Sequence, residues 1–501
     1  MRRDGMLLVV ETLNPELRSL LARELTYVKH TFLRGWAAKA AGRKFMPVPT
    51  ACFSIKTDPH GVLPSVLMTA AGYLSRISAA LREAGWTPLL KDVSPTRRDF
   101  VFQPRWARLD DVDFRWQQRE LLELMVQYAQ RNRPARIDCP PGYGKSFIIK
   151  CLARLLPKAR IDVTTHSLDV IRQIFNDLRG DLPSVGFVGG GKRRYDERVM
   201  CYSGKSLHHA AGDADILLVD EGHEFATPDY LARLARYTHS RRFMFSASQD
   251  VRADNADFEL LGAFGPIAMT IPYAEAVAHQ CIVPIEVWWE DVYMDCSPCD
   301  SYDDPTARNR WGIWRNETRN EVIAAAARRF PEDDQVLVTV ATVEHAAFLK
   351  QKLPEFTLCY GENGLTEADR ERYVRWGLLT RDEPRMTLSR REQLKDAFSA
   401  GELKKVIATG VWNRGVDFRD LAVLVRADAQ DSAVADTQIP GRVSRLGQAA
   451  GKECGIVIDF RDQFDAYFKR KAGNRERRYE KQKWLQRFPE YNASLERFTR
   501  R

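Results

Sequence analysis

The sequence contains one glycine-rich loop whose residues suit the binding of a nucleotide. The segment Pro140-Pro141-Gly142-Tyr143-Gly144-Lys145-Ser146 follows a predicted strand and precedes the apolar stretch 147–156, which we expect to be a helix. In this setting glycines let backbone N–H groups close on phosphate oxygens, and the helix N-terminus adds positive potential. Lys145 would reach the β- and γ-phosphates and Ser146 would ligate Mg²⁺. The loop predicts ATP and Mg²⁺ binding over a purely structural turn, although Cys139 stands where the strict pattern has glycine.

Two adjacent carboxylates follow a second apolar stretch. Residues 216–219 are wholly apolar and lead into Asp220-Glu221-Gly222-His223. Open α/β sheets bind ligands beyond the carboxyl ends of their strands, so Asp220 could hold Mg²⁺ there while Glu221 takes a proton from an attacking water. Acidic pairs after strands also occur as helix caps. The phosphate loop upstream favours the catalytic interpretation.

Short apolar runs alternating with longer amphipathic stretches predict the framework that positions these loops. From Val112 onward the pattern is typical of βαβ units with parallel sheets. The expected strands fall into two groups, at 137–139, 161–164, 216–219 and 243–246, and at 336–340, 406–408, 423–425 and 455–458. Helices are expected at 345–353 and 392–400. Two α/β domains follow, at 111–283 and 316–460.

The remaining segments break this rhythm. Residues 1–110 lack a phosphate loop and are expected to form a small α+β N-terminal domain, in which 63–84 has helix-like apolar spacing ending near Gly85. Prolines at 284, 298 and 305 place the predicted linker at 284–315. The polar stretch 362–387 is a predicted insertion. The basic segment 461–501 is a predicted helical extension, either packed on the preceding domain or contacting nucleic acid.

Composition sets broad limits on the class of protein. A chain of 501 residues is expected to form two to four domains, and 44% hydrophobic with 29% charged residues is typical of soluble globular proteins. The net charge of +9 gives weak support for an anionic partner. The sequence contains no apolar run near the roughly 20 residues that a membrane span needs, so we expect a cytosolic protein.

The nine cysteines are scattered, which is typical of reduced thiols in a cytosolic protein. Four soft ligands, His279, Cys281, Cys296 and Cys299, could in principle bind zinc. However, HxC followed by a single CxxC is not one of the strong zinc spacings. We therefore expect loop cysteines without zinc.

The order of the motifs resembles that of superfamily 2 helicases of the DExH type. Gly144-Lys145-Ser146, Asp220-Glu221-Gly222-His223 and Ser246-Ala247-Ser248 look like motifs I, II and III. In the second half, 408–417 and 438–445 resemble motifs V and VI. The resemblance covers about residues 112–460 and looks closest to phage UvsW-like, RecG-like and XPB-like DNA helicases. It implies two tandem RecA-like domains with an ATPase site at the cleft between them.

The resemblance also implies roles for the residues at matching positions. Arg442 and Arg445 would reach the γ-phosphate from the second domain, and on a helix their spacing would put both on one side. Arg115 and Gln118 look like the element that reads adenine. Gly415 and Asp417 would join the nucleotide site. The residues expected to couple hydrolysis to movement are His223, Ser246, Ser248 and Gln438. Those expected to contact the nucleic-acid backbone are Thr165, His166, Ser167, Thr342 and Thr409.

The function implied is an ATP-dependent DNA helicase or translocase that remodels branched, forked or duplex DNA in replication, recombination or repair. We expect a monomer on DNA, encoded by a bacterium or a phage. The alternatives are a duplex-DNA translocase without strand separation, an RNA helicase, and a non-catalytic scaffold that only binds nucleic acid. The presence of every predicted catalytic residue argues against the scaffold.

Overall fold

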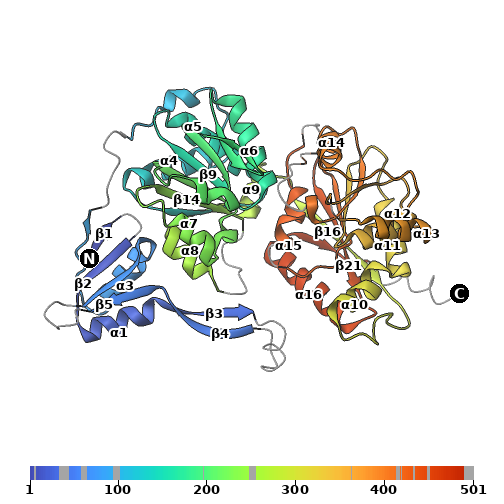
Figure 1. Ribbon diagram of the computed structural model, residues 1–501, viewed down its shortest axis with the longest axis horizontal. Coiled ribbons are helices and arrows are strands. Elements are labelled where there is room, and N and C mark those ends of the chain that lie inside the picture. The colour runs from blue at the N-terminus through green and yellow to red at the C-terminus, as the bar shows by residue number, and fades with distance from the viewer. Residues whose placement is uncertain are drawn as a thin grey trace. The chain divides into compact units, whose positions relative to one another are not determined.

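The chain forms two compact units (Figure 1). The computed structural model describes residues 1–4, 7–32, 45–57, 65–93, 102–195, 197–247, 255–362, 364–412, 418, 420–432, 435–447 and 452–489. The first unit consists of Met1–Cys139 and Gly144–Ile271, and the second of Pro140–Tyr143 and Pro272–Arg501. Within these described ranges, no helix is both long enough and apolar enough to cross a membrane.

A small mixed sheet with two helices opens the first unit. Its strands are β1 (Arg2–Asp4), β2 (Leu7–Leu13), β5 (Phe53–Lys56), β6 (Ser65–Ala70) and β7 (Lys91–Asp92), in the order β5-β6-β2-β1-β7. The helices are α1 (Pro15–Glu24) and α3 (Leu74–Glu83). Asn14 caps α1 by accepting the N–H of Leu17 at 2.7 Å. The expected α+β content of this region is therefore confirmed.

The expected helix over 63–84 is wrong in its first part. Residues 65–70 form strand β6, in which Leu67 and Thr69 are buried with one residue between them. This period of two matches a strand, whereas the apolar residues of α3 follow a helical period. A short 3₁₀ turn, Ala71–Tyr73, joins the two elements.

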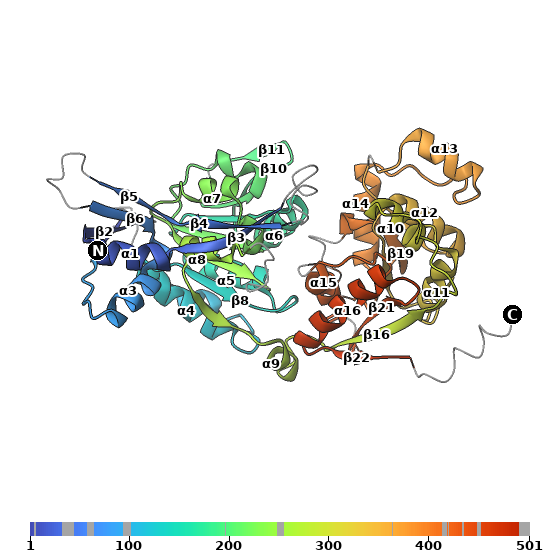
Figure 2. The same cartoon turned by 90° about the horizontal axis from the view of Figure 1, so that it is seen from below.

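The N-terminal elements pack on helix α8 (Asp257–Phe264) of the same unit. Tyr73 donates its hydroxyl to the carbonyl oxygen of Phe258 at 2.7 Å. The antiparallel hairpin of β3 (Thr26–Phe32) and β4 (Phe45–Ala51) lies along α8 in both views (Figure 1, Figure 2). Tyr27 and Lys29 on β3 both donate to the Glu259 carboxylate, each at 2.8 Å. The small domain is thus tied to the α/β part of the first unit.

An eight-stranded sheet forms the main part of the first unit. Its strands are β8 (Ala135–Asp138), β9 (Ile161–Thr165), β10 (Gly186–Gly189), β11 (Lys192–Arg194), β12 (Val199–Ser203), β13 (Ile216–Asp220), β14 (Arg241–Ser246) and β15 (Ile267–Thr270), in the order β11-β10-β12-β9-β13-β14-β8-β15. All neighbours are parallel except β10 and β11. The helices of this part, besides α8, are α4 (Gln118–Gln130), α5 (Lys145–Leu155), α6 (Leu168–Asp181) and α7 (Pro228–Leu234). The four predicted strands are confirmed as β8, β9, β13 and β14, and near-continuous apolar runs are typical of parallel strands covered on both faces.

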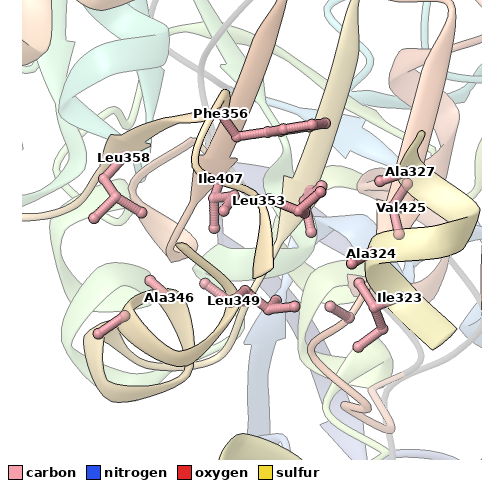
Figure 3. Close-up of a cluster of buried hydrophobic side chains, with 14 of the residues drawn as sticks. Ile323, Ala324, Ala327, Ala346, Leu349, Leu353, Phe356, Leu358, Ile407 and Val425 are labelled. Carbon is pink, nitrogen blue, oxygen red and sulfur yellow. The ribbon is translucent and has the colours of Figure 1, made fainter. Parts of the chain in front are cut away.

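The second unit is built on a seven-stranded parallel sheet. Its strands are β16 (Ile285–Val292), β17 (Val336–Thr339), β18 (Thr357–Cys359), β19 (Lys405–Ala408), β20 (Val423–Arg426), β21 (Gly455–Asp462) and β22 (Leu485–Arg487), in the order β18-β19-β17-β20-β21-β16-β22. The helices are α9 (Tyr273–Ala278), α10 (Pro305–Asn309), α11 (Glu317–Ala327), α12 (Val343–Lys352), α13 (Glu367–Arg375), α14 (Leu388–Ser399), α15 (Ala435–Gln438) and α16 (Ala466–Lys481). Figure 3 shows Ile323 of α11, Leu349 of α12 and Val425 of β20 in one apolar core. The chain therefore has two tandem RecA-like domains.

The expected linker at 284–315 is wrong for its first part. Residues 285–292 form strand β16, which pairs along its whole length with β21. Ile285, Val287 and Trp289 are buried on one side of this strand. The prolines that suggested a linker flank the strand and do not interrupt it.

Two further segments belong to the second unit more closely than the sequence suggested. The expected extension 461–501 contributes α16, in which Phe468, Arg475 and Tyr479 are buried, and also strand β22. This is the packed alternative for that segment. The polar insertion 362–387 contains α13 and anchors Tyr373 in the core.

The contact between the N-terminal elements and α8 yields a stability prediction. A Cβ at Gly72 would lie 2.2 Å from the carbonyl oxygen of Leu261 and 2.4 Å from that of Gly262. Because both are backbone atoms, Gly72→Ala should lower the free energy of unfolding of the first unit by about 1–3 kcal/mol. Chemical denaturation measures this change.

The matched control is Gly180→Ala on α6. A Cβ at Gly180 would meet no described atom within 4 Å, and the residue lies inside a helix. Alanine should stabilise there by up to about 1 kcal/mol. Equal effects of the two substitutions would contradict close packing at Gly72.

Candidate ATPase site

The glycine-rich loop joins β8 to α5, as the sequence predicts. Gly142 and Gly144 have φ of 83° and 107°, in the left-handed region that favours glycine. A Cβ at Gly144 would also lie 2.9 Å from Nε2 of Gln118. Cys139 is buried in the core and donates its N–H to the carbonyl of Ser246 at 3.1 Å. Its departure from the strict pattern therefore leaves the two glycine positions intact.

Lys145, the first residue of α5, lies against the acidic pair at the end of β13. Its ammonium donates to the Glu221 carboxylate, and its Nζ lies 3.7 Å from Oδ1 of Asp220. Burial alone lowers the pKa of Lys145, but the carboxylates of Glu221 and Asp220 outweigh that effect and raise it above its ordinary value. Lys145 is therefore held charged beside two carboxylates, at the carboxyl edge of the sheet.

Asp220 fits the role of a magnesium ligand. It ends β13 and is 4% exposed, and its Oδ1 accepts no hydrogen bond from the described residues. Burial raises the pKa of Asp220, with Lys145 opposing the shift. A buried carboxylate oxygen that accepts no hydrogen bond from the described residues suits a bound cation. Asp220 and Ser146, the second residue of α5, would hold Mg²⁺, and Lys145 with the loop N–H groups would hold the phosphates.

The acidic pair is joined to the end of the next strand. Glu221 has φ of 50°, and the 3₁₀ turn that follows carries His223. The buried His223 ring, through Nδ1, lies 2.9 Å from the hydroxyl of Ser246, which ends β14. This contact brings together two of the predicted coupling residues. Ser248 lies outside the described residues, and Gln438 is half-buried at the end of α15 in the second unit.

The predicted adenine-reading residues lie next to the phosphate loop. Gln118 is 2% exposed at the start of α4, and its Oε1 accepts the N–H of Arg115 at 3.0 Å. Its Nε2 faces Gly144. The structure thus brings Gln118 to the loop, whereas the Arg115 residue is exposed.

Burial separates the predicted nucleic-acid contacts into two groups. Thr165 and Thr409 are 1% and 7% exposed, so both side chains are largely covered in this conformation. Thr165 is the last residue of β9, and Thr409 directly follows β19. By contrast, His166, Ser167 and Thr342 are half-buried at the ends of β9 and β17. Ser167 and Thr342 also cap helices, accepting N–H groups of Val170 at 3.4 Å and His345 at 3.2 Å.

Motif VI does not form the regular helix that the spacing of its arginines suggested. Helix α15 ends at Gln438, and Pro440–Arg442 is a 3₁₀ turn. Pro440 has no N–H to continue a helix, which explains the break. Arg442 is buried and Arg445 half-buried, both in the second unit. Gly415 and Asp417, from motif V, lie outside the described residues.

The sequence reasoning missed a basic surface on the first unit, formed by Lys192, Arg193, His208 and His209. Lys192 and Arg193 are exposed on the edge strand β11. The rings of His208 and His209 have centroids 3.9 Å apart, and Arg193 Nη2 lies 3.3 Å from His209 Nε2. Lys192 and Arg193 give this basic edge a positive charge, which would attract phosphate. The adjacent basic residues and paired histidines in the sequence were its signal.

Two of the four soft ligands, Cys281 and Cys299, contact other protein groups. Cys281 contacts the carbonyl oxygen of His279 at 3.8 Å, and Cys296 is exposed. Cys299 lies 3.2 Å from Ser297 Oγ and 3.6 Å from an Asp465 carboxylate oxygen. Among the residues whose placement is described, no three His, Cys, Asp or Glu side chains are grouped to hold a metal ion.

Comparison with known proteins extends the sequence and fold observations. The helicase conserved C-terminal domain family matches residues 319–447. A protein called putative helicase 22, from a Sulfolobus islandicus filamentous virus, is 24% identical over 368 residues, which are 66% of this chain and 61% of that protein. The chain thus spans about three fifths of the length of this curated relative.

A solved structure shares the fold of most of this chain. Dbp5 of S. cerevisiae, bound to RNA and ADP BeF3, matches 76% of this chain and 92% of its own, with 14% identity and a TM-score of 0.52. T4 UvsW matches 97% of both chains, with 14% identity and a TM-score of 0.37. In its matched C-terminal domain and its tandem RecA-like fold, the chain is thus similar to helicases of superfamily 2.

Proposed function

We propose that this chain is a nucleic-acid-dependent ATPase that acts as a DNA helicase or translocase. One observation carries the proposal: the Lys145 ammonium contacts Glu221 beside Asp220, at the end of a loop with two left-handed glycines. A cation and two carboxylates at the phosphate-binding edge of a parallel sheet are the groups that phosphoryl transfer to water requires.

Each of these residues has a separate role. Lys145 and the loop N–H groups bind the phosphates, so Lys145 must exchange its bond to Glu221 for phosphate oxygens when ATP enters. Glu221 is then released to orient a water and accept its proton. Asp220 and Ser146 hold Mg²⁺, which when bound neutralises charge on the phosphates. Binding of ATP therefore frees Glu221, the base that activates the water for ATP hydrolysis.

Arg442 and Arg445 supply charge from the second unit. A planar guanidinium stabilises the charge that develops on the transferred phosphoryl group. Because these arginines lie on another domain, their arrival would couple domain closure to hydrolysis. The contact of His223 with Ser246 would carry changes at the acidic pair to the end of β14.

The proposed nucleic-acid contacts are His166, Ser167, Thr342 and the basic edge. Hydroxyl, imidazole and basic groups grip phosphates without reading bases, as a motor that moves along any sequence requires. The resemblance to UvsW-like, RecG-like and XPB-like helicases favours DNA, in replication, recombination or repair. An RNA helicase is the second candidate, because Dbp5, whose fold this chain shares, is seen bound to RNA.

The first prediction identifies the substrate class. ATP turnover is measured with single-stranded, duplex, forked and four-way junction DNA, and with RNA. We expect the greatest stimulation by duplex or branched DNA. Displacement of a paired strand would indicate a helicase, whereas displacement of a triplex-forming strand alone would indicate a translocase. Stimulation by RNA alone would contradict the DNA assignment, and a folded protein without turnover would contradict the ATPase.

The second prediction separates binding from chemistry. Glu221→Gln should bind ATP but hydrolyse it very slowly, because only the proton acceptor is lost. Lys145→Ala should lose hydrolysis and unwinding while DNA binding without nucleotide survives. Nucleotide titration and steady-state turnover distinguish the two variants. Loss of ATP binding in Glu221→Gln would show that Glu221 is structural.

The third prediction concerns Arg445. Arg445→Ala should leave ATP affinity nearly unchanged and lower turnover by about 10³-fold, as for other arginine fingers. Arg445→Lys should restore little, since lysine lacks the planar fork. The control is Arg375→Ala, an exposed arginine at the end of α13 in the same unit. Wild-type turnover in Arg445→Ala would refute a role for this residue in the site.

A further inference from the structure

We propose that helix α16 positions the motif VI arginines through the ion pair of Arg478 with Asp436. The inference rests on the proposed function, because it treats Arg442 and Arg445 as parts of the ATPase. It makes Arg478 a positioning residue, more than thirty residues beyond motif VI in the chain.

Asp436 is the residue of α15 that forms the ion pair with α16. It is fully buried, two residues before Gln438, with which motif VI begins. Its Oδ2 accepts a hydrogen bond from Arg478 of α16, and its Oδ1 lies 3.0 Å from Nη1 of Arg426. The helices α15 and α16 lie side by side in both views (Figure 1, Figure 2). Motif VI thus starts from an ion pair with α16.

Helix α16 is itself fixed to the sheet. Arg475 donates to the Asp459 carboxylate of β21 at 2.9 Å, and Tyr479 donates to the same carboxylate at 2.7 Å. Arg426, at the end of β20, donates to the Tyr479 hydroxyl. All four side chains are at most 1% exposed. Because α16 is fixed to the sheet, the position of Arg478 is fixed as well.

The charges of this cluster explain why Arg478 matters. Arg426 and Arg475 are two fully buried cations, and they face three buried carboxylates, Asp428, Asp436 and Asp459. Arg478, with its side chain 29% exposed, adds a cation to Asp436. Without it, Asp436 would share Arg426 with two other aspartates. A buried carboxylate that loses an ion-pair partner moves toward water, so Asp436 would shift and α15 would move with it.

The other end of motif VI is held by backbone contacts. The carbonyl of Ser444 accepts the N–H of Val283 at 2.8 Å. The carbonyl oxygen of Val443 would lie 2.2 Å from a Cβ at Gly455, so these two segments are in close contact. Arg442 therefore lies between two fixed points, and Arg445 directly follows the second of them. Loss of the Asp436 anchor would let the arginines shift, and a misplacement of about 1 Å can cost about 10²-fold in rate.

The experiment compares two neighbouring arginines of α16. Arg478→Ala should lower nucleic-acid-stimulated kcat by about 10–100-fold, with KM for ATP close to that of the wild type and with the folded state verified by thermal unfolding. Arg477→Ala is the matched control, because Arg477 is exposed and, among the residues that the structure describes, bonds only Gly473 and Asn474 of its own helix. Arg478→Lys should restore most of the turnover, since a single nitrogen, Nη1, makes both contacts of Arg478, to Asp431 and Asp436.

A double-mutant cycle with Arg445→Ala tests the proposed route. If Arg478 acts through motif VI, Arg478→Ala should have little further effect on kcat in the Arg445→Ala background. Wild-type turnover in folded Arg478→Ala, or independent effects that multiply, would overturn the inference. If Arg445→Ala alone has no effect, the proposed role of motif VI fails first, and the two failures are distinguishable. Should Arg478→Ala unfold, Arg478→Gln provides the same cycle with the side-chain volume kept.

Discussion

The contact between Lys145 and Glu221 depends on the parallel order of three strands. Strand β14 lies between β8 and β13 and pairs with both in the same direction. Parallel pairing brings the carboxyl ends of all three to one edge, where Lys145, Glu221 and Ser246 follow their strands. Each group would be costly to bury alone. Lys145 and Glu221 form an ion pair, and His223 contacts the hydroxyl of Ser246. These two contacts fix the loops relative to each other.

The second unit uses buried charge differently. Its cluster around Arg426 and Asp459 holds β20, β21, α15 and α16 together. Buried ion pairs are often no more stabilising than apolar packing, yet removal of one partner is strongly destabilising. Such a cluster therefore specifies one arrangement of helix and strand. That property suits a segment whose arginines must be placed accurately.

Local patterns predicted much of the molecule. Strands covered on both faces were recognised as apolar runs, and the phosphate loop and acidic pair were placed correctly because their context is local. Errors arose where one pattern has two interpretations. The spacing of the apolar residues in 65–70 fits both a helix and a strand. The prolines around β16 suggested a linker, although they flank a strand.

Contacts between distant residues could not be predicted from one sequence. Nothing in the spacing of Asp436, Asp459 and Arg478 indicates that they meet, since long loops and whole elements separate them. The burial of Thr165 depends on how far β9 continues, which an apolar run does not specify to the residue. In motif VI, Pro440 indicates a break in the helix, whereas the spacing of the arginines indicates a continuous helix.

The position of β16 has a consequence for folding during synthesis. This strand lies between β21 and β22, so Ile285 pairs with Gly455, and both neighbours are made much later than β16 itself. Such long-range pairing is slow, and an unpaired strand exposes N–H and C=O groups that other chains can bind. Until the ribosome has completed residue 462, the nascent second unit carries an open sheet edge. Over that interval the unpaired strand is a site at which nascent chains can associate and aggregate.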